Sequence, residues 1–177
     1  MIKKMTLKNI KDINKANDSF NVIGRIIPTY ENGMWSYVEE IYSNSYEKKY
    51  DDEDTAHYDY QKYVNNNDYA IYFYYYDNKC VGQIILHSNW NRYAFIEDIS
   101  VLGDYRGKGI GHALINTAIE WAKQNNLCGL MLETQDVNLL ACRFYSKLGM
   151  KIGAVDNMLY ANFPTYNERA IFWYLKF

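Results

Sequence analysis

Arg106-Gly107-Lys108-Gly109-Ile110-Gly111 is the stretch that decides the fold of this 177-residue chain. It lies between a predicted strand, residues 93–102, and a segment with the apolar spacing of a helix. Three glycines let backbone N–H groups approach a ligand closely. The start of a helix adds unpaired donors and the positive end of the helix dipole. The pattern therefore predicts a pyrophosphate cradle, with Arg106 and Lys108 as cationic partners.

Two familiar phosphate-binding loops do not fit this stretch. A Walker loop needs glycine at position 102 and Ser or Thr at position 109, but the chain has Leu102 and Gly109. A dinucleotide fingerprint fails at its last position, which is His112 or Leu114 according to where it starts. What remains is R-x-x-G-x-G between a strand and a helix, and a plain turn without a ligand stays open as the alternative.

The segments after the glycine turn complete a βαβ unit. Ile110, Leu114, Ala118 and Trp121 recur at spacings of three and four, so a helix is predicted from residue 110 to about residue 125. The run GLMLETQ (129–135) predicts a strand. A second helix is expected over about 137–148, closed by Gly149.

The flanking segments read mainly as strands. Extended stretches are expected over 20–44 around an Asn-Gly turn, and over about 69–76, 80–88, 151–161 and 169–177. The acidic run 51–54 is expected to open a short helix that ends near Val64. Together these elements predict an α/β (α+β) fold: a single domain with a mixed, mostly antiparallel sheet, a central βαβ unit and flanking helices.

Composition narrows the class of protein. Hydrophobic residues make up 49% of the chain, the net charge is −2, and the isoelectric point is near 5.9. A nucleic-acid-binding protein would normally show a basic surface. The net negative charge therefore predicts no nucleic-acid partner. The three cysteines and three histidines form no metal-ligand pattern, and no metal is predicted. Neither a secretory signal nor a membrane span is apparent, which favours a cytoplasmic protein without a membrane partner.

Two motifs together resemble the GNAT superfamily of N-acetyltransferases. They are the R-x-x-G-x-G turn after FIEDISVL (95–102) and NLLACRFYSKLGM (138–150) after the strand LMLET (130–134). More narrowly, NWNRYAFIEDISV (89–101) and the ending AIFWYLKF (170–177) are similar to streptothricin N-acetyltransferases. The resemblance implies acetyl transfer from acetyl-CoA to an amine on the lysine-derived arm of an antibiotic. It also implies one domain over 1–177, with 1–68 on the substrate side and 69–177 as the acetyl-CoA core.

The same resemblance implies where acetyl-CoA binds. Backbone groups of one strand end would meet the pantetheine and the thioester, the glycine turn would hold the diphosphate, and the second motif would contact the pantetheine arm. The residues of the strand end are Ile99, Ser100 and Val101. Those of the glycine turn are Arg106, Gly107, Lys108, Gly109, Ile110, Gly111 and His112, and those of the second motif are Asn138, Ala141 and Tyr145.

Acetyl transfer to an amine needs an acid and a base. The resemblance implies that Tyr145 protonates the departing thiolate, while a core tyrosine is the alternative. A lysine-like amine has a pKa of about 10.4 and must lose a proton, so a base is required. Glu97 and Glu133 are equally ranked candidates. Glu97 and Asp98 are adjacent on one strand and are expected on opposite faces, with Asp98 binding the cationic substrate. For each carboxylate a salt-paired structural role stays open.

The expected partner is a small cationic amine. Tyr30, Trp35 and Trp90 could offer ring faces to it, although strand packing explains them as readily. The acidic run 51–54 could steer it electrostatically. Acetylation of protein amines and acetyl-CoA sensing without turnover are the competing interpretations. The sequence leaves open a monomer or a homodimer.

Overall fold

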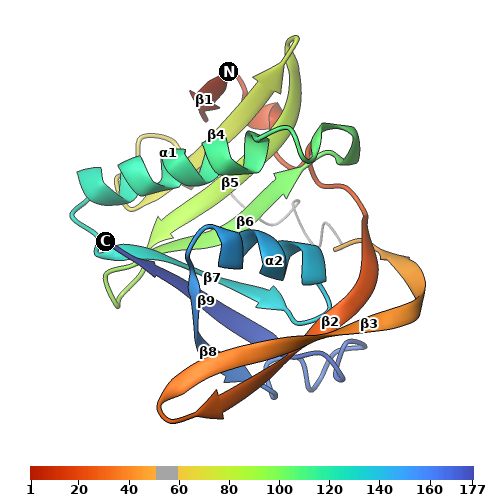
Figure 1. Ribbon diagram of the computed structural model, residues 1–177. Coiled ribbons are helices and arrows are strands. Elements are labelled where there is room, and N and C mark those ends of the chain that lie inside the picture. The colour runs from red at the N-terminus through yellow and green to blue at the C-terminus, as the bar shows by residue number, and fades with distance from the viewer. Residues whose placement is uncertain (51–59) are drawn as a thin grey trace. The chain divides into compact units, whose positions relative to one another are not determined.

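The computed structural model describes residues 1–50 and 60–177, whose helices and strands are labelled in Figure 1. Contacts between residues divide the chain into two compact units. The first comprises Met1–Phe20 and Lys49–Leu130, and the second comprises Asn21–Lys48 and Met131–Phe177. The acidic run 51–54 and the predicted start of its helix lie outside the described residues. Of that helix, the described part forms only a short 3-10 helix, η2 (Tyr60–Tyr63).

The first unit is an antiparallel sheet with a helix on one face (Figure 1). Its strand order is β1-β4-β5-β6, and each neighbouring pair is antiparallel. The helix α1 packs across β4, β5 and β6. The bounds are β1 (Ile2–Lys4), β4 (Tyr69–Tyr76), β5 (Lys79–Ser88), β6 (Ala94–Val101) and α1 (Ile110–Gln124). In addition to η2, the unit contains the 3-10 helices η1 (Ile10–Asp12) and η3 (Gly103–Tyr105).

The two faces of this sheet have different neighbours. On one face, a Cβ at Gly82 would meet Ile110 and Leu114 of α1 at 3.1 and 3.3 Å, so glycine lets the helix lie close. On the other face, Met5, Tyr63, Phe73 and Ile85 belong to one buried cluster. Predicted bounds for α1, β4 and β5 are confirmed to within one residue, because their apolar periodicity matches the faces they bury.

A β-bulge in β6 overturns one expectation about the carboxylates. Ile85 pairs with Asp98 and Leu86 pairs with Ile96, so Glu97 is an extra residue without a partner across the ladder. Such an insertion breaks the strict alternation of side chains. Glu97 contacts His87 and Asp98 contacts Gln83, two residues on the same face of β5. The prediction of opposite faces was therefore wrong, and both carboxylates lie on the face away from α1.

The second unit contains a three-stranded ladder, one helix and a long hairpin (Figure 1). Its ladder runs in the order β7-β9-β8, with β8 and β9 antiparallel. The hairpin turns at Asn32 and Gly33, both with positive φ, as the Asn-Gly pair predicts. The bounds are β7 (Gly129–Gln135), α2 (Leu139–Lys147), β8 (Lys151–Asp156), β9 (Ala170–Lys176), β2 (Phe20–Glu31) and β3 (Met34–Lys48), with the first residues of β2 and β7 counted in the first unit.

Three boundaries differ from the predicted ones. The strand expected over 151–161 ends at Asp156, whose side chain accepts hydrogen bonds from the amides of Met158 (2.7 Å) and Leu159 (3.0 Å) and so turns the chain. Helix α2 begins at Leu139, because Asn138 caps it with a side-chain oxygen. β3 continues to Lys48 as a mostly exposed strand, which carries no clear apolar alternation.

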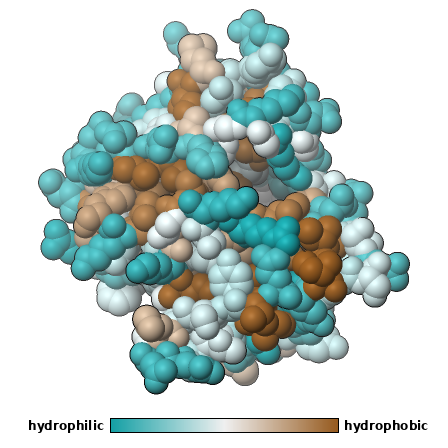
Figure 2. Space-filling model, in the orientation of Figure 1, coloured by the Kyte–Doolittle hydropathy of each residue, from teal (hydrophilic) through white to brown (hydrophobic). Residues whose placement is uncertain are grey.

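Apolar residues on the surface are broken into patches. Figure 2 shows separate brown areas among hydrophilic residues on the face that it presents. Met34, Val38 and Ile41 of β3 are among the exposed large apolar side chains. Within the described residues, no helix has the length and apolar character needed to cross a membrane.

Candidate active site

The glycine turn has the backbone that a phosphate cradle needs. Gly107 and Gly109 have φ of +75° and +81°, and nothing lies within 4 Å of a Cβ added to either one. Glycine therefore suits these two positions because the backbone is left-handed there, and not because neighbouring atoms pack closely. Gly109 is the N-cap of α1 and has no side-chain cap. The first helical hydrogen bond runs from the amide of Ala113 to Gly109, so the three preceding helical amides have no acceptor within the helix.

The two cations of the turn have partners of their own. Arg106 donates from Nε to the carbonyl of Val101 and from Nη1 to the carbonyl of Ser19, both at 2.8 Å. These bonds use two of its five N–H groups and anchor the turn. The ammonium of Lys108 lies 5.1 Å from the ring centre of Tyr105. The residue types and the backbone fit a diphosphate, with Arg106 also holding the loop in place.

The strand end that leads into the turn is paired with β5. Ile99, Ser100 and Val101 pair with Ile84, Gln83 and Gly82 across the ladder to β5. Their predicted role toward a pantetheine arm depends on backbone groups, and it stays a prediction.

The second motif places a tyrosine inside the second unit. Tyr145 lies on α2, is only 6% exposed, and has its ring 6.2 Å from that of Trp173. Asn138 precedes the helix and its Oδ1 accepts the amide of Ala141 at 3.3 Å. The cap explains why an asparagine suits position 138, directly before α2. Their predicted contacts with pantetheine remain open.

The carboxylates of the first unit belong to polar networks. Glu97 lies 2.5 Å from His87 Nδ1 and accepts the hydroxyl of Tyr63 at 3.3 Å. Asp98 accepts Gln83 Nε2 at 2.6 Å and the hydroxyl of Ser100 at 3.2 Å. The proximity of Asp98 to a buried glutamine ties it to the scaffold, while Glu97 keeps 28% of its side chain exposed.

Glu133 has a different environment, in the second unit. It lies on β7, and burial raises the pKa of its carboxyl above the ordinary value. The hydroxyl of Tyr160 donates to its Oε1 at 2.5 Å, which works against that shift in pKa. Tyr160 lies 27 residues further along the chain, in an irregular segment, so no sequence pattern pointed to it.

Two charged pairs beside β7 were also missed by sequence reasoning. Arg25 of β2 donates twice to Asp136, a fully buried carboxylate that also accepts the amide of Arg169. Lys48 of β3 donates to Glu168 at 2.6 Å and to Gln135 at 2.7 Å. These pairs tie the hairpin to the segment that precedes β9, all within the second unit. Since the partners lie more than 80 residues apart, local spacing could not reveal them.

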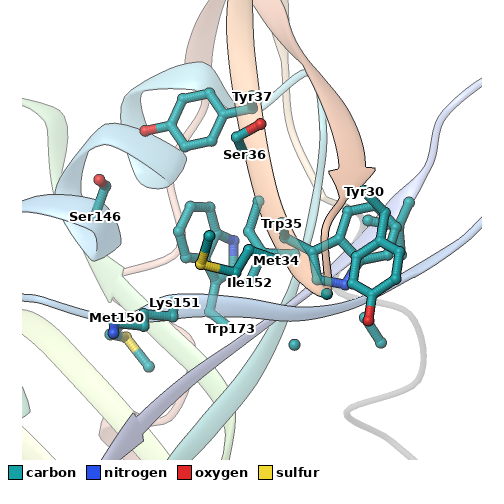
Figure 3. Close-up of a pocket in the computed structure, with 14 residues that line it drawn as sticks. Tyr30, Met34, Trp35, Ser36, Tyr37, Ser146, Met150, Lys151, Ile152 and Trp173 are labelled. Atoms are coloured by element: carbon teal, nitrogen blue, oxygen red, sulfur yellow. The ribbon is translucent and has the colours of Figure 1, made fainter.

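The aromatic candidates for substrate binding belong to different units. Tyr30 and Trp35 flank the hairpin turn, with ring centres 5.0 Å apart, and both line a pocket of the second unit (Figure 3). Trp90 lies on a turn of the first unit and is 91% exposed. Among the described residues, no group of three or more His, Cys, Asp or Glu side chains is arranged to hold a metal ion.

The order of elements is typical of acyl-coenzyme A-dependent transferases. It comprises a strand, a glycine turn, a helix, a strand and a helix with a buried tyrosine. Residues 35–150 match the acetyltransferase (GNAT) family, and the chain belongs to that family. It is therefore an N-acetyltransferase, and acetyl-CoA is the co-substrate of the family. The predicted fold class is confirmed, with a mixed seven-stranded sheet and two α-helices in the described residues.

Individual relatives carry more specific names. The chain is 57% identical to streptothricin acetyltransferase A of Bacillus subtilis strain 168 over 100% of both chains. It is 42% identical to an Escherichia coli streptothricin acetyltransferase over 62% of this chain and 64% of the relative. A crystal structure assigned to a streptothricin acetyltransferase from Bacillus anthracis, in complex with acetyl coenzyme A, has a TM-score of 0.90 at 38% identity. It covers 100% of this chain and 99% of its own.

Proposed function

We propose that this enzyme acetylates an amine on the lysine-like arm of streptothricin and thereby inactivates the antibiotic. The observation that carries the proposal is the 57% identity to a streptothricin acetyltransferase over the whole of both chains. The full-length likeness to a structure with bound acetyl coenzyme A supports acetyl-CoA as the donor. The predicted division into a substrate-side part (1–68) and an acetyl-CoA core (69–177) belongs to the same proposal, as does a cytoplasmic location.

Glu133 is the carboxylate best suited to act as the base. A lysine-like ammonium must lose its proton before the nitrogen can attack. A base is most effective when its pKa lies near the working pH, and burial moves the pKa of Glu133 in that direction. Glu97 is instead engaged with His87 and Tyr63. We therefore assign the base to Glu133, with Tyr160 positioning its carboxylate.

Tyr145 completes the proposed chemistry as the acid. The amine nitrogen forms a bond to the thioester carbonyl carbon, and the bond from that carbon to sulfur breaks. Glu133 takes one proton from the ammonium before the attack, and the phenol proton of Tyr145 passes to the sulfur, so that a thiol leaves. The second proton lost by the nitrogen restores the phenol of Tyr145. The amides of Ile110, Gly111 and His112 hold the diphosphate during this transfer.

Mass spectrometry tests the proposal directly. Streptothricin incubated with the protein and acetyl-CoA should gain the mass of one acetyl group, and fragmentation should locate it on the lysine-like arm. Peptides with free N-termini and with lysine serve as competing acceptors in the same thiol-release assay. Faster acetylation of a peptide than of streptothricin would contradict the proposal.

A further inference from the structure

A pocket of about 920 Å³ lies within the second unit, between the hairpin, the end of α2 and the strands β8 and β9 (Figure 3). This volume is in the range of sites that hold small molecules. Four aromatic side chains line it: Tyr30, Trp35, Tyr37 and Trp173. Flat rings favour a flat group, because stacked contact removes the most apolar surface from water.

The floor of the pocket holds a buried donor without a partner. Trp173 is 1% exposed, and its Nε1 is the buried side-chain nitrogen or oxygen among the described residues that has no hydrogen-bond partner. An unmade hydrogen bond at a buried donor is costly. Met34, which is 70% exposed, lines the same pocket. Because a methionine side chain is flexible, Met34 can adapt to a molecule that enters the pocket and offers an acceptor atom to Nε1.

The charges around the pocket select against a cationic group. Its lining, drawn from described residues, contains one ammonium, that of Lys151, and no carboxylate. An ammonium or guanidinium would therefore find no carboxylate partner in the lining and would lie near the like charge of Lys151, with only the ring faces to attract it. An uncharged planar group with a carbonyl or ring-nitrogen acceptor fits the rings, the buried donor and the charge together.

Trp173 also connects the pocket to the proposed chemistry. Its ring contacts Tyr37 at 6.1 Å on the pocket side, and it contacts Tyr145 at 6.2 Å. Resting on the function proposed above, we propose that this pocket binds an uncharged, planar, acceptor-bearing part of the antibiotic. The reacting amine on the lysine-like arm would lie outside the pocket.

Nuclear magnetic resonance can observe the proposed contact without turnover. The chain has four tryptophans, so its indole N–H groups give four resolvable signals, and Trp173→Phe identifies the one from Trp173. Adding streptothricin without acetyl-CoA should shift that signal to lower field, while lysinamide, which has only the charged arm, should not. A Trp173 signal that is unmoved by saturating streptothricin overturns the proposal, as does one that moves with coenzyme A alone.

Kinetics separate this proposal from the function on which it rests. Trp173→Phe keeps an aromatic side chain but replaces the indole by a smaller ring without the donor, so the KM for streptothricin should rise at least about three- to tenfold, the effect of one neutral hydrogen bond. Trp35→Leu should raise it as well, and neither change should alter the KM for lysinamide. Trp121→Phe makes the same substitution in the core of the first unit and controls for lost stability. Equal effects on both acceptors would refute the pocket, whereas no acetylation by the unaltered enzyme would refute the function.

Discussion

The phenol of Tyr145 can act as an acid or only as a packing group, and kinetics distinguish the two. Its ring is buried against Trp173 and Phe144, so Tyr145→Phe keeps the packing and removes only the hydroxyl. The affinity for acetyl-CoA should stay nearly the same, while kcat should fall about 100-fold, as expected for the loss of a general acid. Calorimetry and steady-state rates measure the two quantities. An unchanged kcat would leave Tyr145 as a packing residue.

The pair Glu133 and Tyr160 predicts a shift in the pH profile. The base must be ionised, so activity should fall as the pH drops through the pKa of Glu133. Burial raises that pKa, and the hydroxyl of Tyr160 lowers it. Tyr160→Phe should therefore move the acid limb of kcat/KM to higher pH. Tyr166→Phe, an exposed tyrosine in the same segment, should leave the profile unchanged. A loss of activity at all pH values, without a moved limb, would indicate a structural role for Tyr160 alone.

At the residue scale, local conformations could be predicted from the sequence, whereas contacts between distant residues could not. Gly109 and Asn138 belong to local patterns, so their conformations at the helix starts follow from neighbouring residues. Tyr160 and Arg25 act on partners 27 and 111 residues away, and such contacts depend on the assembled unit. Sequence reasoning therefore located the start of α1 at Ile110, whereas the partners of Glu133 and Asp136 depend on contacts that the sequence does not show.

At the scale of an element, the start of α1 depends on one left-handed residue. Gly109→Ala should lower the free energy of unfolding by about 1–2 kcal/mol, because a side chain is strained at φ of +81°. A distorted cradle should also weaken acetyl-CoA binding about tenfold, which calorimetry measures. Gly111→Ala lies inside the helix and should instead raise stability by up to about 1 kcal/mol. Equal thermal shifts in the two variants would contradict this reading of the turn.

The hairpin of the second unit depends on a buried charge pair. Arg25→Met leaves the fully buried carboxylate of Asp136 without its cation, so the free energy of unfolding should fall by about 3–5 kcal/mol. Arg143→Met removes a similar pair with Glu39, but those side chains are 37% and 31% exposed, and the loss should be about 1 kcal/mol or less. Denaturant unfolding compares the two variants. Similar losses would mean that Asp136 finds another partner or reaches water.

The bulge in β6 is a feature of a strand that could not be predicted from its sequence. Period-2 alternation placed Glu97 and Asp98 on opposite faces, and it fails because one extra residue enters the ladder. The bulge carries no glycine or proline signal, since FIEDISV contains neither. Its consequence is chemical, because it gathers Glu97, Asp98, His87 and Gln83 on one face of the first unit.

For the whole molecule, the order of the helices and strands could be predicted from the sequence, whereas their tertiary pairings could not. In the described part of the chain, seven of the nine strands and both α-helices lie where apolar periodicity and turn residues indicate. An eighth strand, β8, was also expected but is shorter than predicted. β1 was not foreseen, because a three-residue strand gives no periodic signal. The family could be inferred from two motifs, since glycine spacing and a capped helix express a local requirement. The pocket around Trp173 could not, because its walls come from five separate elements, β2, β3, α2, β8 and β9.

The net charge of the whole molecule predicts how salt affects the encounter with a cationic antibiotic. The chain carries −2 at neutral pH, and four consecutive acidic residues, 51–54, concentrate negative charge outside the described residues. Attraction between exposed charges is screened beyond about 10 Å at 0.1 M salt. The KM for streptothricin should therefore rise several-fold as salt increases from about 0.05 to 0.5 M, while kcat stays nearly constant. Replacing all four acids by their amides should flatten this dependence. If the KM of the unaltered enzyme is already insensitive to salt, the acidic run serves only as a solvated segment.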